Sequence, residues 1–176
     1  MSATTLNQHT FITDDGNRLI LKNVRLLCSR HKNSVYAVKL GRKHFAMKVQ
    51  NNRPQLQSEQ YLMSHEIEML KFFEEKGVTR VPRVVHTGKY EDRQAFIMTP
   101  LGEKYDTDES IRNIYQRFPV GFRSYRRLLH RWQSQVSEAH KTFTQLGIDV
   151  GHTDYVRVGN DFYLVDFERA TFRDKK

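Results

Sequence analysis

A carboxylate in the middle of an apolar helix face is the first feature of this sequence that could do chemistry. Residues 57–76 have a helical period, and at about 100° per residue Glu66 falls among apolar side chains while Glu68 points to the opposite side. Burying an unpaired charge is costly, so Glu66 needs a cationic partner. The best candidate is Lys48, which is surrounded by apolar neighbours in the strand-like run HFAMKVQ. The sequence therefore predicts a buried ion pair, and an ion pair with no functional role is the alternative interpretation. The apolar neighbours of Glu66 on the helix are Leu62, Met69, Leu70 and Phe73.

Other carboxylates gather near the end of the sequence. Asp166 follows a run of strand-forming residues in FYLVDF. A carboxylate at the end of a strand suits a hard cation such as Mg²⁺, although aspartate is also a common turn residue. Asp149 and Asp154 lie shortly before that run.

The elements that would position these residues differ between the two halves of the chain. The first half contains short runs rich in β-branched and aromatic residues, which indicate antiparallel strands, and LGRK supplies a hairpin turn. The helix over 57–76 would end at Gly77, a suitable C-cap. The expected strands are Ile20–Leu27, Ser34–Leu40, Lys43–Gln50, Arg83–His86 and Gln94–Met98.

The second half is expected to be mainly helical. Asp106–Tyr115 and Ser124–Gln145 have helical patterns, and two strands around the turn GND follow them. The Pro and Gly stretch TPLG, residues 99–102, marks the boundary. The predicted fold is α+β with two lobes: a five-stranded antiparallel sheet carrying one helix, followed by a truncated helical lobe. Residues 1–17 would form an N-terminal tail, 18–101 the first lobe and 102–176 the second.

These segments resemble the motifs of protein kinases, in the order in which that family carries them. FAMK resembles the motif of the third kinase strand, and HEIEMLKFF resembles the helix whose glutamate pairs with the strand lysine. The resemblance implies that Lys48 holds the α and β phosphates of ATP and that Glu66 fixes Lys48. YLVDFERA resembles the metal-binding DFG motif, which makes Asp166 the implied Mg²⁺ ligand and puts Glu168 in place of glycine.

The segments that would contact the nucleotide resemble kinase motifs less closely. AFIMTPLGEKY resembles the fifth strand and the interlobe hinge of kinases, so that Met98, Thr99 and Leu101 would lie beside the adenine. Kinases cover the phosphates with a glycine-rich loop, but the matching stretch CSRHKNSVYAVK contains no glycine. Arg30 and Lys32 are the cations of this stretch that would contact phosphates there. The lack of glycine puts close backbone approach to the phosphates in doubt.

The catalytic loop admits more than one alignment. In GIDVGHTDYVRVGND, Asp154 ends a His-x-Asp triplet and is the first candidate for the base that accepts the substrate proton, but Gly159 then replaces the family's metal-binding asparagine. The alternative makes Asp149 the base and Asp154 a second metal ligand. An alignment without gaps places His152 on the catalytic aspartate, which would favour a pseudokinase.

Charge and composition narrow the function class. The 176 residues carry 29 Lys and Arg against 20 Asp and Glu, a formal net charge of +9, so the surface should attract anions. YRRLLHRW interleaves cations with aromatics, which favours either nucleic-acid binding or, our preferred interpretation, the solvated side of a helix. No long apolar run and no signal-peptide pattern is found, and the single cysteine fits a reducing compartment.

Few residues follow Asp166, so no activation loop of the usual kind is expected. In this the chain resembles the small kinases that bacteria inject into host cells as type III secretion effectors, one of which phosphorylates and inactivates the chaperone HSP90. The resemblance implies ATP and Mg²⁺ as cofactors and a protein substrate such as a host chaperone. It also implies a monomer in the cytoplasm or the host cytosol, with no membrane partner. A pseudokinase, a basic nucleic-acid-binding domain and a small-molecule kinase are the alternatives.

Overall fold

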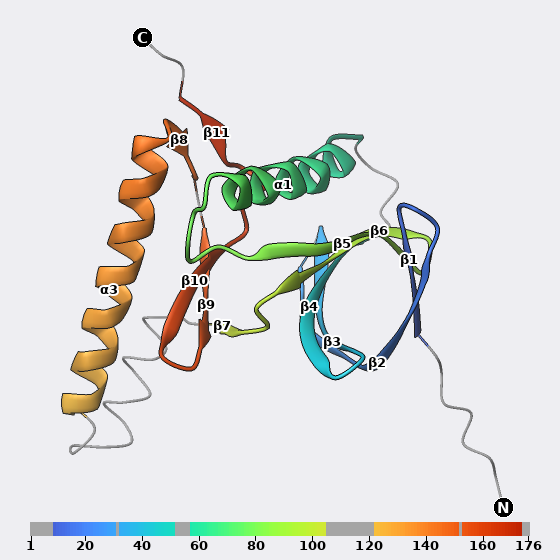
Figure 1. Cartoon of the computed structure of the whole chain (residues 1–176), viewed down its shortest axis with the longest axis horizontal. Coiled ribbons are helices and arrows are strands. Elements are labelled where there is room, and N and C mark those ends of the chain that lie inside the picture. The colour runs from blue at the N-terminus through green and yellow to red at the C-terminus, as the bar shows by residue number, and fades with distance from the viewer. Residues whose placement is uncertain (1–8, 31, 52–56, 105–121, 152, 174–176) are drawn as a thin grey trace, which may run out of the picture. The chain divides into compact units, whose positions relative to one another are not determined.

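The computed structural model of the chain describes residues 9–30, 32–51, 57–104, 122–151 and 153–173 (Figure 1). The chain divides into two compact units. The first contains Met1–Met63 and Arg83–Leu101, and the second contains Ser64–Pro82 and Gly102–Lys176. Most of the helix around Glu66 thus groups with the second unit, whereas the sequence analysis assigned it to the first lobe. The helix expected at 106–115 lies outside the described residues.

The first unit is a closed antiparallel barrel of six strands, in the order β1-β2-β3-β4-β6-β5 (Figure 1). The expected five-stranded sheet was therefore one strand short. The additional strand comes from the segment that the sequence analysis treated as a tail, and its inward-facing residues Phe11 and Thr13 are buried. The strands are β1 (His9–Thr13), β2 (Arg18–Ser29), β3 (Asn33–Leu40), β4 (Lys43–Gln50), β5 (Arg83–Tyr90) and β6 (Arg93–Thr99).

Closure of the barrel depends on a close approach between β1 and β5. Thr13 pairs with Gly88, and a Cβ atom on Gly88 would lie 2.0 Å from the carbonyl oxygen of Ile12. Only glycine fits there. The sequence analysis placed this glycine in a loop, but β5 continues to Tyr90, and the turn to β6 consists of Glu91 and Asp92, both with positive φ.

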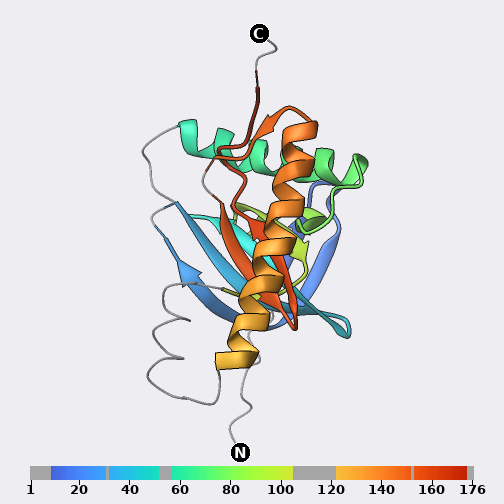
Figure 2. The same ribbon diagram turned by 90° about the vertical axis from the view of Figure 1, so that its left-hand side faces the viewer.

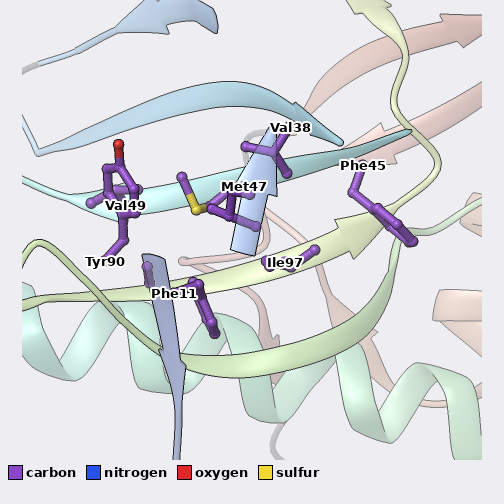
Figure 3. Close-up of a cluster of buried hydrophobic side chains, with 9 residues drawn as sticks. Phe11, Val38, Phe45, Met47, Val49, Tyr90 and Ile97 are labelled. Atoms are coloured by element: carbon purple, nitrogen blue, oxygen red, sulfur yellow. The ribbon is translucent and has the colours of Figure 1, made fainter. Parts of the chain in front are cut away.

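The interior of the barrel is filled by apolar side chains from all six strands (Figure 3). Phe11 from β1 and Tyr90 from β5 lie in the same cluster, so the additional strand contributes to the core and does not simply cover an edge. The buried members are Phe11, Leu21, Val38, Phe45, Met47, Val49, Tyr90, Ala95 and Ile97.

The second unit combines helices with short strands, so it is richer in strand than predicted. Its part of α1 (Gln57–Glu75) begins at Ser64, and α3 (Phe122–Gln145) is the expected long helix. One sheet has the order β10-β9-β7, and β8 pairs with β11. The strands are β7 (Glu103–Lys104), β8 (Ile148–Asp149), β9 (Asp154–Val158), β10 (Asp161–Val165) and β11 (Thr171–Phe172).

Gly77 ends α1 as predicted. Its φ is 66°, its amide donates to the carbonyl of Glu74 at 3.0 Å, and the amide of Val78 donates to the carbonyl of Phe73 at 2.9 Å. This is the Schellman pattern, in which a left-handed residue satisfies the last carbonyls of a helix. Phe73, whose carbonyl takes part in this cap, has its ring in the aromatic core of the second unit.

Three phenylalanine rings form the centre of the second unit. The ring of Phe73 lies 5.0 Å from the rings of both Phe143 and Phe167, which are themselves 5.9 Å apart. All three side chains are essentially inaccessible to solvent. They come from α1, from α3 and from the segment after β10, so this contact joins the three parts of the unit. Figure 2 shows α3 running along the β9–β10 hairpin.

Candidate active site

Lys48 is a buried cation in the first unit. It lies in β4 between Val35 of β3 and Phe96 of β6, and its exposed fraction is 6%. The flanking Met47 and Val49 are fully buried in the barrel core. The apolar setting predicted for this lysine is therefore present. Its predicted pairing with Glu66 joins residues of different units and stays a prediction.

The predicted adenine and phosphate contacts also belong to the first unit. Met98, buried in β6, pairs with Ala46 of β4, two positions from Lys48 along that strand. Thr99 ends β6, and Leu101 follows it. Both are half-buried. At the turn between β2 and β3, Arg30 is exposed and Lys32 is half-buried. The β2–β3 turn, Lys48 of β4 and the strand β6 thus belong to one sheet.

Glu66 is a buried anion in the second unit, with an exposed fraction of 2%. The helical-wheel prediction is confirmed for its described neighbours, since Met69, Leu70 and Phe73 are buried and Glu68 is exposed. Its Oε1 accepts a hydrogen bond from the backbone amide of Phe167 at 3.4 Å. A carboxylate on α1 therefore contacts the residue next to Asp166, which the sequence analysis did not foresee.

A second contact between α1 and this segment was also missed. The Nε2 atom of His65 lies 2.5 Å from the carbonyl oxygen of Ala170, so Nε2–H donates. The amide of Ala170 in turn donates to the carbonyl of Phe167 at 3.1 Å, closing a turn. His65 and Glu66 thus hold the two ends of the turn that follows Asp166. The available signal was that His65 sits beside Glu66 on the helix.

The β9–β10 hairpin brings two of the predicted metal ligands together. Asp154 begins β9 directly opposite Val165, the last residue of β10 and the one before Asp166. Opposed Cα atoms in antiparallel strands are about 4.5–5.5 Å apart, so the two aspartates lie about one residue from each other. Asp166 has a φ of 74°, a conformation that costs energy in a residue other than glycine and that is concentrated at functional sites. Both side chains are half-buried.

Asp149 belongs to the same unit as this pair. It ends β8, is exposed, and pairs with Thr171 of β11. Its Oδ1 accepts a hydrogen bond from the amide of Gly151 at 2.9 Å, which fixes the carboxylate on the loop that leads to Asp154. His152, the third residue considered for the catalytic position, lies outside the described residues.

The donor set fits Mg²⁺ bound together with a phosphate. Among the described residues, no group of three or more His, Cys, Asp or Glu side chains could hold a metal ion. Mg²⁺ commonly takes one or two protein carboxylates and fills its other positions with water and phosphate oxygens. Asp154 and Asp166 could supply those two carboxylates.

Gln135 of α3 anchors the hairpin that carries both aspartates. Its exposed fraction is 8%, its Oε1 accepts from the buried amide of Phe162 at 2.9 Å, and its Nε2 donates to Asp161 at 3.0 Å. Asp161 also contacts Arg80 at 3.2 Å and Arg131 at 3.4 Å. The hydrogen bond from Gln135, aided by these two cations, holds the pKa of Asp161 below its ordinary value of 3.8. Sequence reasoning missed this role; the available signal was the helical spacing, which puts Gln135 three residues after Trp132 and four before Ala139.

The basic stretch of α3 agrees with a solvated helix side. Arg126, Arg127, His130 and Arg131 are exposed, whereas Trp132 is half-buried and packs edge-on against the ring of Tyr155 at 5.6 Å. Within the described ranges, neither helix is both long enough and apolar enough to cross a membrane.

Comparison with known proteins gives a fold but no close relative. No protein-family model matches the sequence, and no curated protein matches it. Among solved structures, the kinase domain of PF14_0431 aligns with a TM-score of 0.65 at 14% identity, over 94% of this chain and 54% of that one. Vaccinia related kinase 3 aligns with a TM-score of 0.60 at 13% identity, over 96% and 53%. The chain spans about half the length of these kinases, and it has a protein-kinase-like fold.

Proposed function

We propose that this chain is an ATP-dependent phosphotransferase that transfers the γ-phosphoryl group to a hydroxyl of a protein. The observation that carries the proposal is the register of the β9–β10 hairpin, which sets Asp154 beside Asp166. Phosphoryl transfer needs charged groups held in position and asks for little covalent chemistry from the protein. Paired carboxylates at this hairpin of a protein-kinase-like fold meet that need.

The same register supports the alignment of the catalytic loop in which Asp149 is the base and Asp154 a second metal ligand. With Asp154 next to Asp166, both would hold Mg²⁺, and Asp149 would orient the acceptor hydroxyl and take its proton. Lys48 would bind phosphate oxygens, and its burial keeps the ammonium in a fixed place. Glu66 would act through two contacts, the predicted one with Lys48 and the observed one with the amide of Phe167.

When bound, ATP supplies the phosphoryl group and Mg²⁺ offsets the charge that develops on its oxygens. The chain's own contribution is positional. The turn from Asp166 to Ala170 is fixed by α1, and the hairpin is fixed by α3, so the metal-binding carboxylates need little reorganisation.

A protein acceptor of the Ser or Thr type, and a role as a secreted effector acting on a host protein, are the finer parts of the proposal. They rest on the resemblance to small effector kinases and on the net charge of +9, which favours an acidic partner surface. Nucleic acid is the competing partner, and binding that is strong and steeply salt-dependent would favour it.

Incubation with radiolabelled ATP, Mg²⁺ and a host-cell lysate tests the activity. We expect Lys48→Ala and Asp166→Ala to abolish labelling, and Asp149→Asn to reduce it strongly, while the circular dichroism spectrum stays native. Wild-type protein that binds ATP and Mg²⁺ but labels nothing would instead indicate a pseudokinase.

The roles of Asp149 and Asp154 are separated by the Mg²⁺ requirement. Loss of a metal ligand should raise the Mg²⁺ concentration needed for half-maximal rate, so Asp154→Asn should shift it and Asp149→Asn should lower kcat without a shift. The reverse pattern would restore Asp154 as the base.

A further inference from the structure

One side chain holds the turn that joins β2 to β3. Asn51 follows the last residue of β4, and its Nδ2 donates to the carbonyl of Arg30 at 2.7 Å. Its backbone amide donates to the carbonyl of Lys32 at 2.8 Å, and its Oδ1 accepts from the hydroxyl of Ser34 at 2.8 Å. The Ser34 hydroxyl also lies 2.9 Å from that of Ser29. Asn51 therefore contacts the turn at three separate points.

The described residues of this turn do not require glycine. None of its described residues, Cys28–Arg30, Lys32 and Asn33, has a positive φ. Glycine is needed where the chain must adopt left-handed conformations, and that need does not arise at these positions. Three hydrogen bonds of Asn51, two from its side chain and one from its backbone amide, hold the described part of the turn in place.

The hydrogen bonds also change what the turn presents to a ligand. The carbonyls of Arg30 and Lys32 accept from Asn51, and the carbonyl of Asn33 accepts from the amide of Arg30 at 2.8 Å. Carbonyl oxygens that are engaged in this way are less available to repel an anion. The exposed Arg30 and the half-buried Lys32 add positive charge, so the turn favours polyanions.

The turn lies close to the buried lysine of the same barrel. Asn33 pairs with Gln50 and Val35 pairs with Lys48 in the β3–β4 ladder. At about 3.4 Å per residue, the β3 end of the turn is about 7 Å along the strand from Lys48. An extended polyphosphate can therefore contact both within the first unit.

We infer that Asn51 is a positioning residue for a triphosphate site formed by Arg30, Lys32 and Lys48, in which cationic side chains on a pinned turn replace a glycine-rich loop. The inference rests on the proposed function, since it specifies how the nucleotide phosphates are recognised. It concerns the triphosphate alone, so a ligand with one phosphate should depend little on Asn51.

Nucleotide affinity measured without turnover tests this. The dissociation constants of fluorescent ATP and AMP analogues, each with Mg²⁺, are compared for the full-length wild type, Asn51→Ala and Asn160→Ala. Asn160 is an exposed asparagine in the β9–β10 turn and serves as the matched control. We expect Asn51→Ala to raise the dissociation constant of the ATP analogue about tenfold, which corresponds to about 1.4 kcal/mol. The dissociation constant of the AMP analogue should not change. Amide exchange within residues 29–34 should become faster.

If Asn51→Ala does not fold, Ser34→Ala removes one of the three contacts and should give a smaller weakening in the same direction. In turnover, the variants should raise KM for ATP with kcat nearly unchanged. Equal loss of ATP and AMP affinity, or no loss of either while the wild type binds ATP, overturns the inference and leaves the proposed function standing. A wild type that binds neither analogue overturns both.

Discussion

Replacing Gln135 by alanine should loosen the hairpin that carries Asp154 and Asp166. The variant removes the acceptor of the buried amide of Phe162 and the donor that reaches Asp161. A buried amide that loses its acceptor costs about 1–3 kcal/mol. The bond to Asp161 adds at most about 0.5 kcal/mol, because that carboxylate is 39% exposed and is screened by water. The expected loss is therefore about 1–3.5 kcal/mol of unfolding free energy.

The fluorescence of the single tryptophan can measure this loss in the second unit. Trp132 lies on α3 and packs on Tyr155 of the hairpin, so its fluorescence during urea unfolding reports on the second unit. Gln133→Ala is the matched control, since Gln133 is exposed on the same helix and should change stability by less than about 0.5 kcal/mol.

The pH dependence separates the two hydrogen bonds of Gln135. The pKa of Asp161 is lowered, so its stabilising contribution is present above the ordinary value of 3.8 and is lost as the pH falls through the lowered value. The difference between wild type and Gln135→Ala should shrink in that range by the Asp161 part, while the part due to Phe162 persists. If Gln135→Ala and Gln133→Ala have equal stability at neutral pH, the reasoning is refuted.

Three further predictions concern other contacts. Gly88→Ala should destabilise the barrel by about 3 kcal/mol or more, because its Cβ would meet the carbonyl of Ile12, and a thermal melt near that of the wild type would contradict this. Burial raises the pKa of Tyr90 to about 12, so the barrel should lose stability as the pH rises from about 10 towards that value, and Tyr90→Phe should lack this component in alkaline unfolding. His65→Ala should weaken Mn²⁺ binding about fivefold in paramagnetic resonance titrations, because it releases the carbonyl of Ala170. His65→Gln should restore part of the affinity, since its amide can donate to the same carbonyl. Equal Mn²⁺ affinity in the wild type and both variants would exclude a positioning role for His65.

The local elements were predictable because their signals are local. The bounds of β4 follow from its strand-forming residues after the LGRK turn, and the end of α1 follows from Gly77. Both agree with the structure. The buried position of Glu66 follows from helical periodicity alone. These signals require no knowledge of which segments meet in space.

What sequence reasoning missed depends on contacts between distant segments. β1 is five residues long, and only its pairing with both β2 and β5 makes it part of a barrel. Asn51, His65 and Gln135 act on backbone groups far away in the chain, and polar residues with such roles look like any other polar residues in sequence. The strand register that sets Asp154 opposite Val165 could not be read from the hairpin turn, and the proposed metal-binding role of Asp154 rests on it.

Because β1 hydrogen-bonds to strands on both of its sides, it covers the edges of β2 and β5 as well as closing the barrel. Deleting β1 would expose one edge of β2 and one edge of β5, each a row of unpaired amides and carbonyls. Exposed strand edges pair with extended segments of other molecules, so a chain without β1 should self-associate. Shortened versions of this protein are best begun ahead of His9.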